Sequence, residues 1–522
     1  MNMRNRVAGF SAATALTCTS LTACSGWAEE SSGITIGMSE EILSTDPSSG
    51  YDPGSWLLFN NVFQTLLSFP NGGTDPQPEA AESCAFEDTR VQVYRCELKD
   101  GLEFSNGDPL TAEDVKFSFD RIRLIDDKAG PAVMFNMLDS VETPDSKTVV
   151  FRLKVPDATF PSKIASGAGS IVNHREYEAK SLRKDGLVSG SGPYKLTSMS
   201  KDEAVFSPNE SYKGPAEVKN GGVTLKLFHS DQDRLRQSLT DHGIDMAFRG
   251  LPAKDLAGAD SLGGEQGIEI VEGNSAEVQH LVFNMNDPVA GKVGVRKAVS
   301  HLLDRDALIK QVYQDTAIPL YSIIPAGVIG HTTAFFDTYG DRPSQEKAEA
   351  ALRADGIEGK VELTLWSTPS RYGLATDQEM RVIAEQLNSS GLFEAKVKSV
   401  PFDRYEKDIA SGKYGVYVKG WLPDYPDADN FTAPFFGEGN VLANNYSNRT
   451  ITETLIPHSA TKMNRLEASG DFGKIQDIVA EDVPVLPIWQ AKQYAAVHDD
   501  IRGYQYCLDA STVFRFWELS KV

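Results

Sequence analysis

Long apolar runs are missing from the sequence beyond its N-terminus. No stretch there reaches the roughly 18 uncharged, apolar residues that a transmembrane helix requires. Hydrophobic residues make up 41% of the 522 residues and charged residues 24%, which is typical of a globular protein. A chain of this length exceeds what one hydrophobic core usually supports, so we expect at least two lobes in water.

Basic residues are in short supply. The chain has 51 lysines and arginines against 73 aspartates and glutamates, a formal net charge of −22. A charge this negative repels a phosphate backbone, which disfavours nucleic acid as a partner. Net charge does not decide the fold.

Cysteines are also few, and two of the five lie in an N-terminal segment with the features of an export signal. Two arginines precede a mildly apolar stretch, as in a secretory signal peptide. The Leu-Thr-Ala-Cys sequence ending at Cys24 then resembles a bacterial lipobox, in which the cysteine sulfur receives a lipid. We expect a signal peptide over 1–23, lipidation at Cys24 and a flexible tether over 24–33. Plain secretory cleavage is the alternative.

Two further cysteines, Cys84 and Cys96, flank a predicted turn between two short strands. An exported protein can keep a disulfide here, and closing such a loop contributes about 3 kcal/mol of stability. We expect this disulfide, with a pair of buried free thiols as the alternative.

The motifs that mark common enzyme classes are missing as well. The sequence contains no G-x-S-x-G nucleophile elbow, no H-E-x-x-H zinc-binding helix and no Walker-type phosphate loop. The eight histidines are scattered, and none has the spacing of a metal-ligand pair. We therefore expect no enzymatic activity, no cofactor and no metal. A catalytic triad built from distant residues would leave no trace in such a search.

Helix and strand patterns alternate along the chain. The Thr-Ala-Glu-Asp sequence at 111–114 is a capping-box pattern that predicts the start of a helix. Apolar residues at helical spacing predict further helices near 295–303 and 380–387. The second of these lies between two alternating strands, which indicates a βαβ crossover in a mostly parallel sheet. We expect 281–487 to form one α/β unit, with the last residues returning to the first lobe.

Five segments carry recognisable motifs: 98–115 (strand, glycine turn, capped helix), 189–194 (a Gly-Ser-Gly-Pro-Tyr turn), 295–305 (a helix), 420–427 (a Gly-Trp loop) and 484–488 (a segment with two prolines). In this order they resemble the bacterial extracellular solute-binding proteins of family 5, the peptide- and nickel-type binding components of ABC importers. The resemblance spans nearly the whole chain after the tether.

The resemblance implies a two-lobed α/β fold of the periplasmic-binding-protein type (type II). It further implies mixed sheets, an extra subdomain in the first lobe and a ligand cleft between the lobes. We place the first lobe at 34–280, the second at 281–487 and the return to the first lobe at 488–522.

The implied function is to capture a small solute, a short peptide above all, and to deliver it to the permease subunits of an ABC importer. The same architecture would serve an oligosaccharide, a nickel chelate or a ligand-sensing surface receptor. We expect a monomer at the outer face of the cell membrane or in the periplasm.

A free peptide presents an ammonium at one end, and burying that charge requires an acid. In peptide-binding members of the family, an aspartate in the loop resembling 420–427 binds this ammonium, and Asp424 matches it by position. Capping a turn is the alternative role of Asp424. Trp421 and Tyr425, from the same loop, are candidates for the pocket wall, and packing within the lobe is the alternative for Trp421.

The carboxylate end of a peptide requires a base. Arg371, which follows a predicted strand, is our candidate, because an arginine fork binds a carboxylate through two hydrogen bonds. A solvated surface charge is the alternative. From the first lobe, Asp46-Pro47 and Tyr51 lie where members of the family often line the cleft, which is a loose correspondence for both. A simple turn is the alternative for the Asp-Pro pair.

Overall fold

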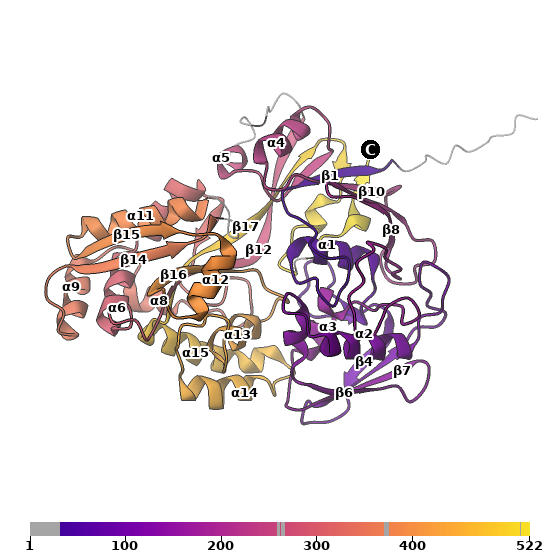
Figure 1. Ribbon diagram of the computed structural model, residues 1–522, viewed down its shortest axis with the longest axis horizontal. Helices are drawn as coiled ribbons and strands as arrows, with labels where there is room; N and C mark the ends of the chain where they lie inside the picture. Colours follow the sequence, from indigo (N-terminus) through magenta and orange to yellow (C-terminus); the bar gives the residue numbers. More distant parts are fainter. Residues whose placement is uncertain (1–31, 258–261, 263–266, 370–374, 512) are drawn as a thin grey trace, which may run out of the picture.

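The computed structural model describes residues 32–257, 262, 267–369, 375–511 and 513–522. The predicted signal peptide, Cys24 and most of the tether lie outside these residues, and so does Arg371. The described part forms two lobes side by side, joined by the long strands β12 (Ile268–Phe283) and β17 (Val485–His498) (Figure 1). The predicted two-lobed α/β fold is confirmed.

One mixed sheet runs through both lobes. Among the described residues it has eleven strands, in the order β15-β14-β16-β12-β17-β11-β1-β10-β9-β8, with β13 paired to β17. The first-lobe strands are β1 (Ile34–Met38), β8 (Tyr194–Met199), β9 (Glu203–Pro208), β10 (Val223–Leu227) and β11 (Met246–Phe248). The other second-lobe strands are β13 (Ala317–Pro319), β14 (Val361–Ser367), β15 (Phe393–Ser399) and β16 (Val416–Trp421).

The predicted βαβ crossover is present in the second lobe. Strands β14 and β15 are parallel, and α11 (Ala375–Ser389) lies between them in the chain. The expectation of a mostly parallel sheet is wrong, because β12 pairs antiparallel with both β16 and β17. Strands β12 and β17 carry the chain into the second lobe and back, so they run in opposite directions.

Separate apolar cores lie within the lobes. Buried side chains between Ala276 and Trp489 form one cluster in the second lobe. A first-lobe cluster combines the N-terminal strand β1 with residues of the C-terminal segment, including Phe514 and Phe516. The predicted boundaries at 280/281 and 487/488 fall inside β12 and β17. They stay predictions, because both strands pass through the two lobes.

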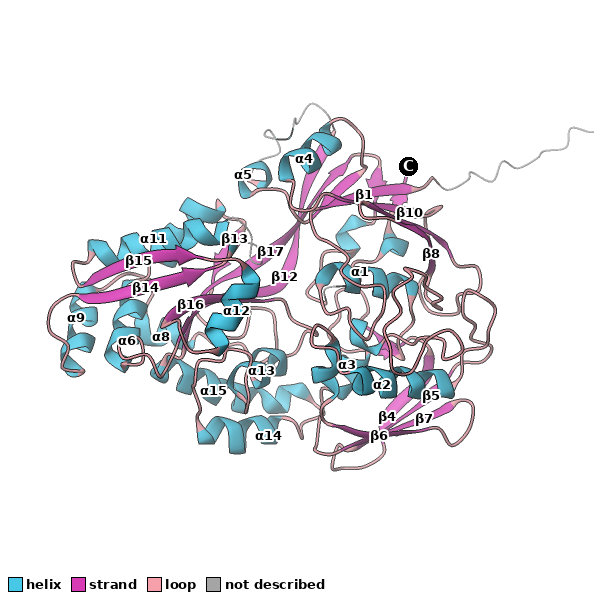
Figure 2. Cartoon of the chain, in the orientation of Figure 1, coloured by secondary structure: helices cyan, strands magenta, loops and turns pink. Residues whose placement is uncertain are grey.

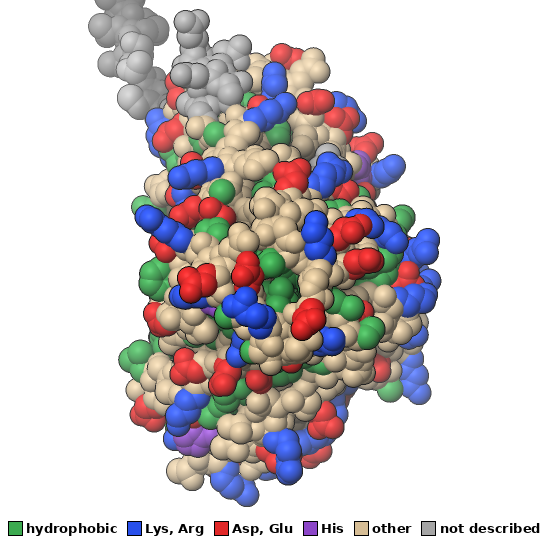
Figure 3. Space-filling view, turned by 90° about the vertical axis from the view of Figure 1, so that its left-hand side faces the viewer, with side chains coloured by type: hydrophobic (Ala, Val, Ile, Leu, Met, Phe, Trp, Pro, Cys, Tyr) green, Lys and Arg blue, Asp and Glu red, His purple; other side chains and the backbone are tan. Residues whose placement is uncertain are grey.

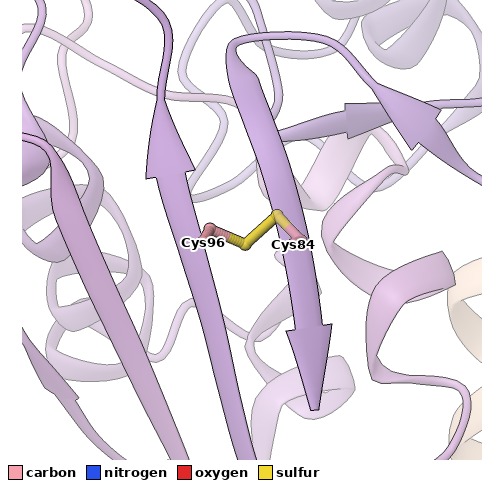
Figure 4. Close-up of a disulfide and its surroundings, with 2 residues drawn as sticks. All are labelled: Cys84 and Cys96. Carbon is pink, nitrogen blue, oxygen red and sulfur yellow. A yellow bond between two sulfur atoms is a disulfide. The ribbon is translucent and has the colours of Figure 1, made fainter. Parts of the chain in front are cut away.

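A second sheet, in the order β4-β5-β7-β6, lies in the first lobe. Its strands are β4 (Ala81–Phe86), β5 (Val93–Leu98), β6 (Leu138–Glu142) and β7 (Thr148–Leu153). Helix α2 (Ala112–Ile125) contacts β6 and β7 and begins with the predicted capping box of Thr111 and Asp114. A disulfide joins Cys84 on β4 to Cys96 on β5 (Figure 4).

Helices pack around the large sheet in both lobes (Figure 2). The longer ones are α1 (Pro53–Val62), α4 (Gln232–Thr240), α6 (Val293–Leu302), α9 (Gln345–Ala354), α12 (Phe402–Ala410) and α15 (Ser469–Asp482). The shorter ones are α3 (Phe160–Ile164), α5 (Ala253–Leu256), α7 (Arg305–Leu308), α8 (Ala334–Tyr339), α13 (Ala433–Phe436) and α14 (Ile456–Ser459). Short paired strands are β2 (Leu67–Ser68), β3 (Gln77–Pro78), β18 (Ile501–Arg502) and β19 (Ser520–Lys521).

The outer face of the second lobe carries many charged side chains (Figure 3). On this face, acidic and basic side chains alternate, and apolar side chains appear only in small groups (Figure 3). None of the helices in the described part of the chain has both the length and the apolar character needed to cross a bilayer.

Candidate functional site

A cavity of about 200 Å³ lies between the two lobes. The loops after β1, β11 and β16 and the start of α1 form its walls, so three strands point their carboxyl ends toward it. Open α/β sheets usually bind their ligands at that end. The lining residues are Glu40, Tyr51, Asp52, Pro53, Trp56, Leu57, Phe248, Arg249, Gly420, Trp421, Leu422, Pro423, Asp424, Gln493, Cys507 and Phe514.

A larger hollow, of about 600 Å³, lies beside α2 on the first lobe. All of its lining residues fall between Thr111 and Ala179, so it does not join the lobes. The interlobe cavity is therefore the better candidate for a ligand whose binding is coupled to closure.

Asp424 is the centre of the polar contacts in the interlobe cavity. Its Oδ2 atom accepts a hydrogen bond from the hydroxyl of Tyr51 at 2.9 Å and another from Nδ2 of Asn430 at 3.1 Å. Tyr51 belongs to the first lobe and Asn430 to the second. The buried carboxylate thus accepts hydrogen bonds from both lobes.

Asn430 also holds the loop in shape. Its Oδ1 atom accepts hydrogen bonds from the backbone N–H of Asp424 and from Nε1 of Trp421, both at 2.9 Å. Sequence reasoning missed this residue, because an asparagine six positions after the aspartate belongs to no motif that we used. Asn430 lies in the short 3-10 helix Ala428–Phe431, which folds the loop back onto itself.

Burial raises the pKa of Asp424 to about 6. The hydrogen bonds from Asn430 and Tyr51 and the charge of Lys163 offset part of this rise. Burial and the neighbouring Asp424 carboxylate raise the pKa of Tyr51 well above its ordinary value, so its hydroxyl stays a neutral donor. Both direct partners of the carboxylate are therefore neutral, and a ligand ammonium would supply a counter-charge.

Aromatic rings form much of the remaining wall. Trp421 lines the cavity and also packs edge-on against Phe435, with ring centroids 5.1 Å apart, so it combines the two roles considered from sequence. The rings of Tyr51 and Trp56 lie 5.7 Å apart on the opposite lobe. The structure thus brings together three of the predicted residues: Tyr51, Trp421 and Asp424.

Tyr425 lies elsewhere. Its ring is buried in a cluster made otherwise of first-lobe side chains, and its hydroxyl donates to Asp429 at 3.0 Å. Tyr425 is therefore not part of the cavity lining but packs in the interface between the lobes. Its contacts tie the second-lobe loop to the first lobe.

Buried charges connect the lobes beside Tyr425. Lys163 of the first lobe pairs with Asp157 at 2.6 Å, and its ammonium lies 6.0 Å from the centre of the Tyr425 ring. Burial alone would lower the pKa of Lys163, but the carboxylates of Asp157 and Asp429 raise it. The backbone N–H of Ala158 also donates to the carbonyl of Ala460 across the interface, at 2.8 Å. These contacts stabilise the closed arrangement of the lobes.

Three charged residues of the cavity were missed from sequence. One is Asp52, which caps α1 by accepting a hydrogen bond from the backbone N–H of Ser55. Glu40 follows β1 and Arg249 follows β11, and they form an ion pair at 2.9 Å. Both residues follow short apolar stretches, but β11 is only three residues long, too short for a strand pattern to stand out in the sequence. Arg371 lies outside the described residues and stays a prediction.

Asp46 does not line the cavity. It is fully buried and forms an ion pair with Arg121 at 2.6 Å, so the loose expectation from sequence is wrong. Its two carboxylate oxygens accept hydrogen bonds from protein donors, and these bonds hold the loop that leads to α1 in place. Within the described residues, no group of three or more histidine, cysteine, aspartate or glutamate side chains is placed to hold a metal ion.

Comparison with known families agrees with this geometry. The sequence model of the bacterial extracellular solute-binding proteins, family 5 Middle, matches residues 75–442 of the chain. The chain belongs to this family. It is thus a solute-binding protein, and the cavity lies where its two lobes meet.

Individual relatives of this solute-binding protein are distant but cover most of its length. The probable D,D-dipeptide-binding periplasmic protein DdpA of Escherichia coli is 24% identical, and the match covers 94% of each chain. The dipeptide-binding protein of the same organism is 25% identical, with 87% of each chain covered. Among solved structures, DppA of Helicobacter pylori in complex with the peptide STSA has a TM-score of 0.79 at 20% identity, covering 94% of this chain and 98% of that one. The likeness supports the same two-lobed fold.

Proposed function

We propose that this solute-binding protein captures short peptides between its lobes and delivers them to the permease of an ABC importer. The observation that carries the proposal is the buried Asp424 carboxylate, which accepts hydrogen bonds from both lobes but has no cation of the described residues in direct contact. A peptide ammonium placed there would be neutralised in a site that only the closed form completes. Two relatives are named as dipeptide-binding proteins, one of them as a probable D,D-dipeptide-binding protein, and this supports the same ligand class.

The cavity favours a small zwitterion over the other solutes considered. Ligand cavities commonly measure about 300–1,000 Å³, and this one measures about 200 Å³, which suits a dipeptide better than a long peptide. An oligosaccharide would leave the charge of Asp424 without a counter-charge, whereas Arg249 is already paired with Glu40. A buried charge without a partner is costly. A peptide supplies an ammonium for Asp424.

Closure follows from contacts on both sides of the ligand. A ligand that touches both lobes binds the closed form better, and it therefore shifts the population toward closure. The permease would then recognise the closed surface. Crystal structures with and without peptide that share one interlobe angle would contradict this mechanism.

Isothermal titration calorimetry tests the proposed ligand. The chain without its lipid anchor is titrated with pools of di-, tri- and tetrapeptides, and with maltooligosaccharides and nickel–histidine as controls. We expect micromolar or tighter binding, about −8 kcal/mol, for dipeptides. Binding of a control solute alone would refute the peptide assignment in favour of that solute.

Peptide binding should weaken in acid. Since Asp424 takes up a proton near pH 6 in the unliganded protein, an ammonium must displace that proton at lower pH. The dissociation constant is expected to rise about tenfold for each pH unit below 6. It should also rise above about pH 8, where the α-amino group of the peptide loses its own proton. Calorimetry between pH 4.5 and 9 measures both limbs.

A Tyr51→Phe variant is the matched control for the loss of affinity below pH 6, which is the acid limb of the plot of affinity against pH. The Tyr51 hydroxyl lowers the pKa of Asp424 through its hydrogen bond, so its removal should move the acid midpoint to a higher pH. The limb above pH 8 belongs to the peptide and should not move. An acid limb that is absent from the wild type, or unaltered in the variant, would contradict the role of Asp424.

The export and anchoring of the chain rest on the sequence alone. The Leu-Thr-Ala-Cys sequence ending at Cys24 and the polar segment after it support a lipid anchor at the outer face of the membrane. Labelled palmitate should be incorporated into the wild-type chain in bacterial cells but not into a Cys24→Ser variant. Equal labelling of the two chains would exclude lipidation at this cysteine.

A further inference from the structure

Arg249 places a cation in the first-lobe wall of the cavity. It follows β11 directly, and β11 pairs in parallel with β1, the strand that precedes Glu40. Nη1 of Arg249 donates to Oε1 of Glu40 at 2.9 Å. The two side chains are 21% and 29% exposed, so the pair is largely but not fully withdrawn from water. It remains open to a molecule in the cavity.

The backbone at Arg249 is held in an uncommon conformation. Its φ angle is +56°, in the left-handed region that residues other than glycine and asparagine rarely adopt. Gly250 follows at φ +99°, and a Cβ atom there would lie 2.1 Å from Oγ of Ser39. The turn therefore lies tightly against the segment that carries Glu40. Strained residues of this kind cluster at ligand clamps.

The guanidinium keeps unused donors. It has five N–H groups, and the bond to Glu40 is the one hydrogen bond of this side chain within the part of the chain that the structure describes. A carboxylate binds an arginine best through two parallel hydrogen bonds. Glu40 engages only one nitrogen, so the guanidinium can bind a second carboxylate without releasing the first.

We propose that Arg249, rather than Arg371, binds the carboxylate of the ligand, with Glu40 holding the guanidinium in position. This inference rests on the proposed function and extends it. The ammonium lies on Asp424 of the second lobe and the carboxylate on Arg249 of the first. The preferred ligands are thus short peptides with a free C-terminus, and the two charges of one ligand draw the lobes together.

The experiment compares two dipeptide pools that differ at one group. One pool has free C-terminal acids, and the other has the same sequences as C-terminal amides. We expect the wild type to bind the acids at least about 30-fold more tightly than the amides, the lower end for a buried hydrogen-bonded charge pair. In Arg249→Gln the ratio of the affinity for acids to the affinity for amides should fall to near one, mainly because the acids bind more weakly. Arg249→Lys keeps the positive charge but not the two parallel donors of the guanidinium. Its affinity ratio of acids to amides should lie between those of the wild type and Arg249→Gln.

Glu40→Gln separates this role from a merely structural one. Removing the negative charge leaves the guanidinium less neutralised, so the preference for acids over amides should increase. If the pair only stabilised the loop, both variants would weaken the two pools equally. Thermal melting verifies that each variant is folded.

The outcomes distinguish the two proposals. A wild type that prefers acids, together with an Arg249→Gln variant that keeps the preference, would overturn the assignment of Arg249 and leave peptide binding intact. Equal binding of acids and amides by the wild type would overturn it as well. Failure of the wild type to bind either pool would refute peptide binding itself, and this subsite with it.

Discussion

Peptide affinity is expected to fall by about 30-fold to several thousandfold when Asp424 is replaced by alanine. Losing one member of a buried, hydrogen-bonded charge pair costs about 2–5 kcal/mol, and each 1.4 kcal/mol is a factor of ten in affinity. The ligand ammonium would then be buried without a counter-charge, beside the neutral groups of Tyr51 and Asn430. Calorimetry with the dipeptide pool measures the loss directly.

Two controls show whether the loss belongs to the site. Asp403→Ala removes a carboxylate of the same kind from an exposed position on α12 and should leave affinity unchanged. The stability of Asp424→Ala without ligand should not fall at pH 7. Burial raises the pKa of this carboxyl to about 6, so ionisation of Asp424 costs stability as the pH rises toward neutrality, and the variant avoids that cost. A folded Asp424→Ala variant that binds peptides within about threefold of the wild type would remove Asp424 from the site.

The parts of the fold that sequence could predict are those that depend on near neighbours. The capping box at Thr111 and Asp114 joins residues three apart, and the structure contains it as predicted. The crossover through β14, α11 and β15 follows from one helix between two strands, and the strand register confirms it. The loop that carries Asp424 could also be recognised from the sequence, because its motif consists of consecutive residues.

The parts that sequence could not predict depend on contacts between distant segments. The bond from Tyr51 to Asp424 spans 373 positions, and that from Arg249 to Glu40 spans 209. No local periodicity encodes which loops meet at the carboxyl ends of the strands. The same limit explains the wrong expectation of a mostly parallel sheet, since the antiparallel pairing of β12 and β17 joins strands separated by the entire second lobe.

The second large effect expected is on stability, from a charge pair that supports the site without touching it. Arg121 on α2 binds both oxygens of Asp46, with Nη1 to Oδ1 at 2.7 Å and Nη2 to Oδ2 at 2.6 Å. Nε of Arg121 also donates to the carbonyl of Glu178 at 2.7 Å. The two side chains are 1% and 0% exposed, so water cannot replace either partner.

Arg121→Met is therefore expected to lower the free energy of unfolding by about 3–5 kcal/mol, because it leaves the Asp46 carboxylate buried without its cation. Urea unfolding followed by tryptophan fluorescence measures the change. Arg449→Met, which breaks an ion pair with side chains 85% and 58% exposed, is the matched control. An exposed pair of this kind contributes less than about 1 kcal/mol.

A double variant distinguishes the pair from ordinary packing. If the cost of Arg121→Met comes from the unpaired carboxylate, then Asp46→Ala combined with Arg121→Met should cost clearly less than the two single changes added together. Additive losses would mean that Arg121 acts through its packing and its bonds to backbone carbonyls instead. Asp46 lies five residues before Tyr51, so Arg121→Met should also loosen the first-lobe loop that contacts Asp424. Peptide affinity should therefore fall together with stability in Arg121→Met, and neither should fall appreciably in Arg449→Met.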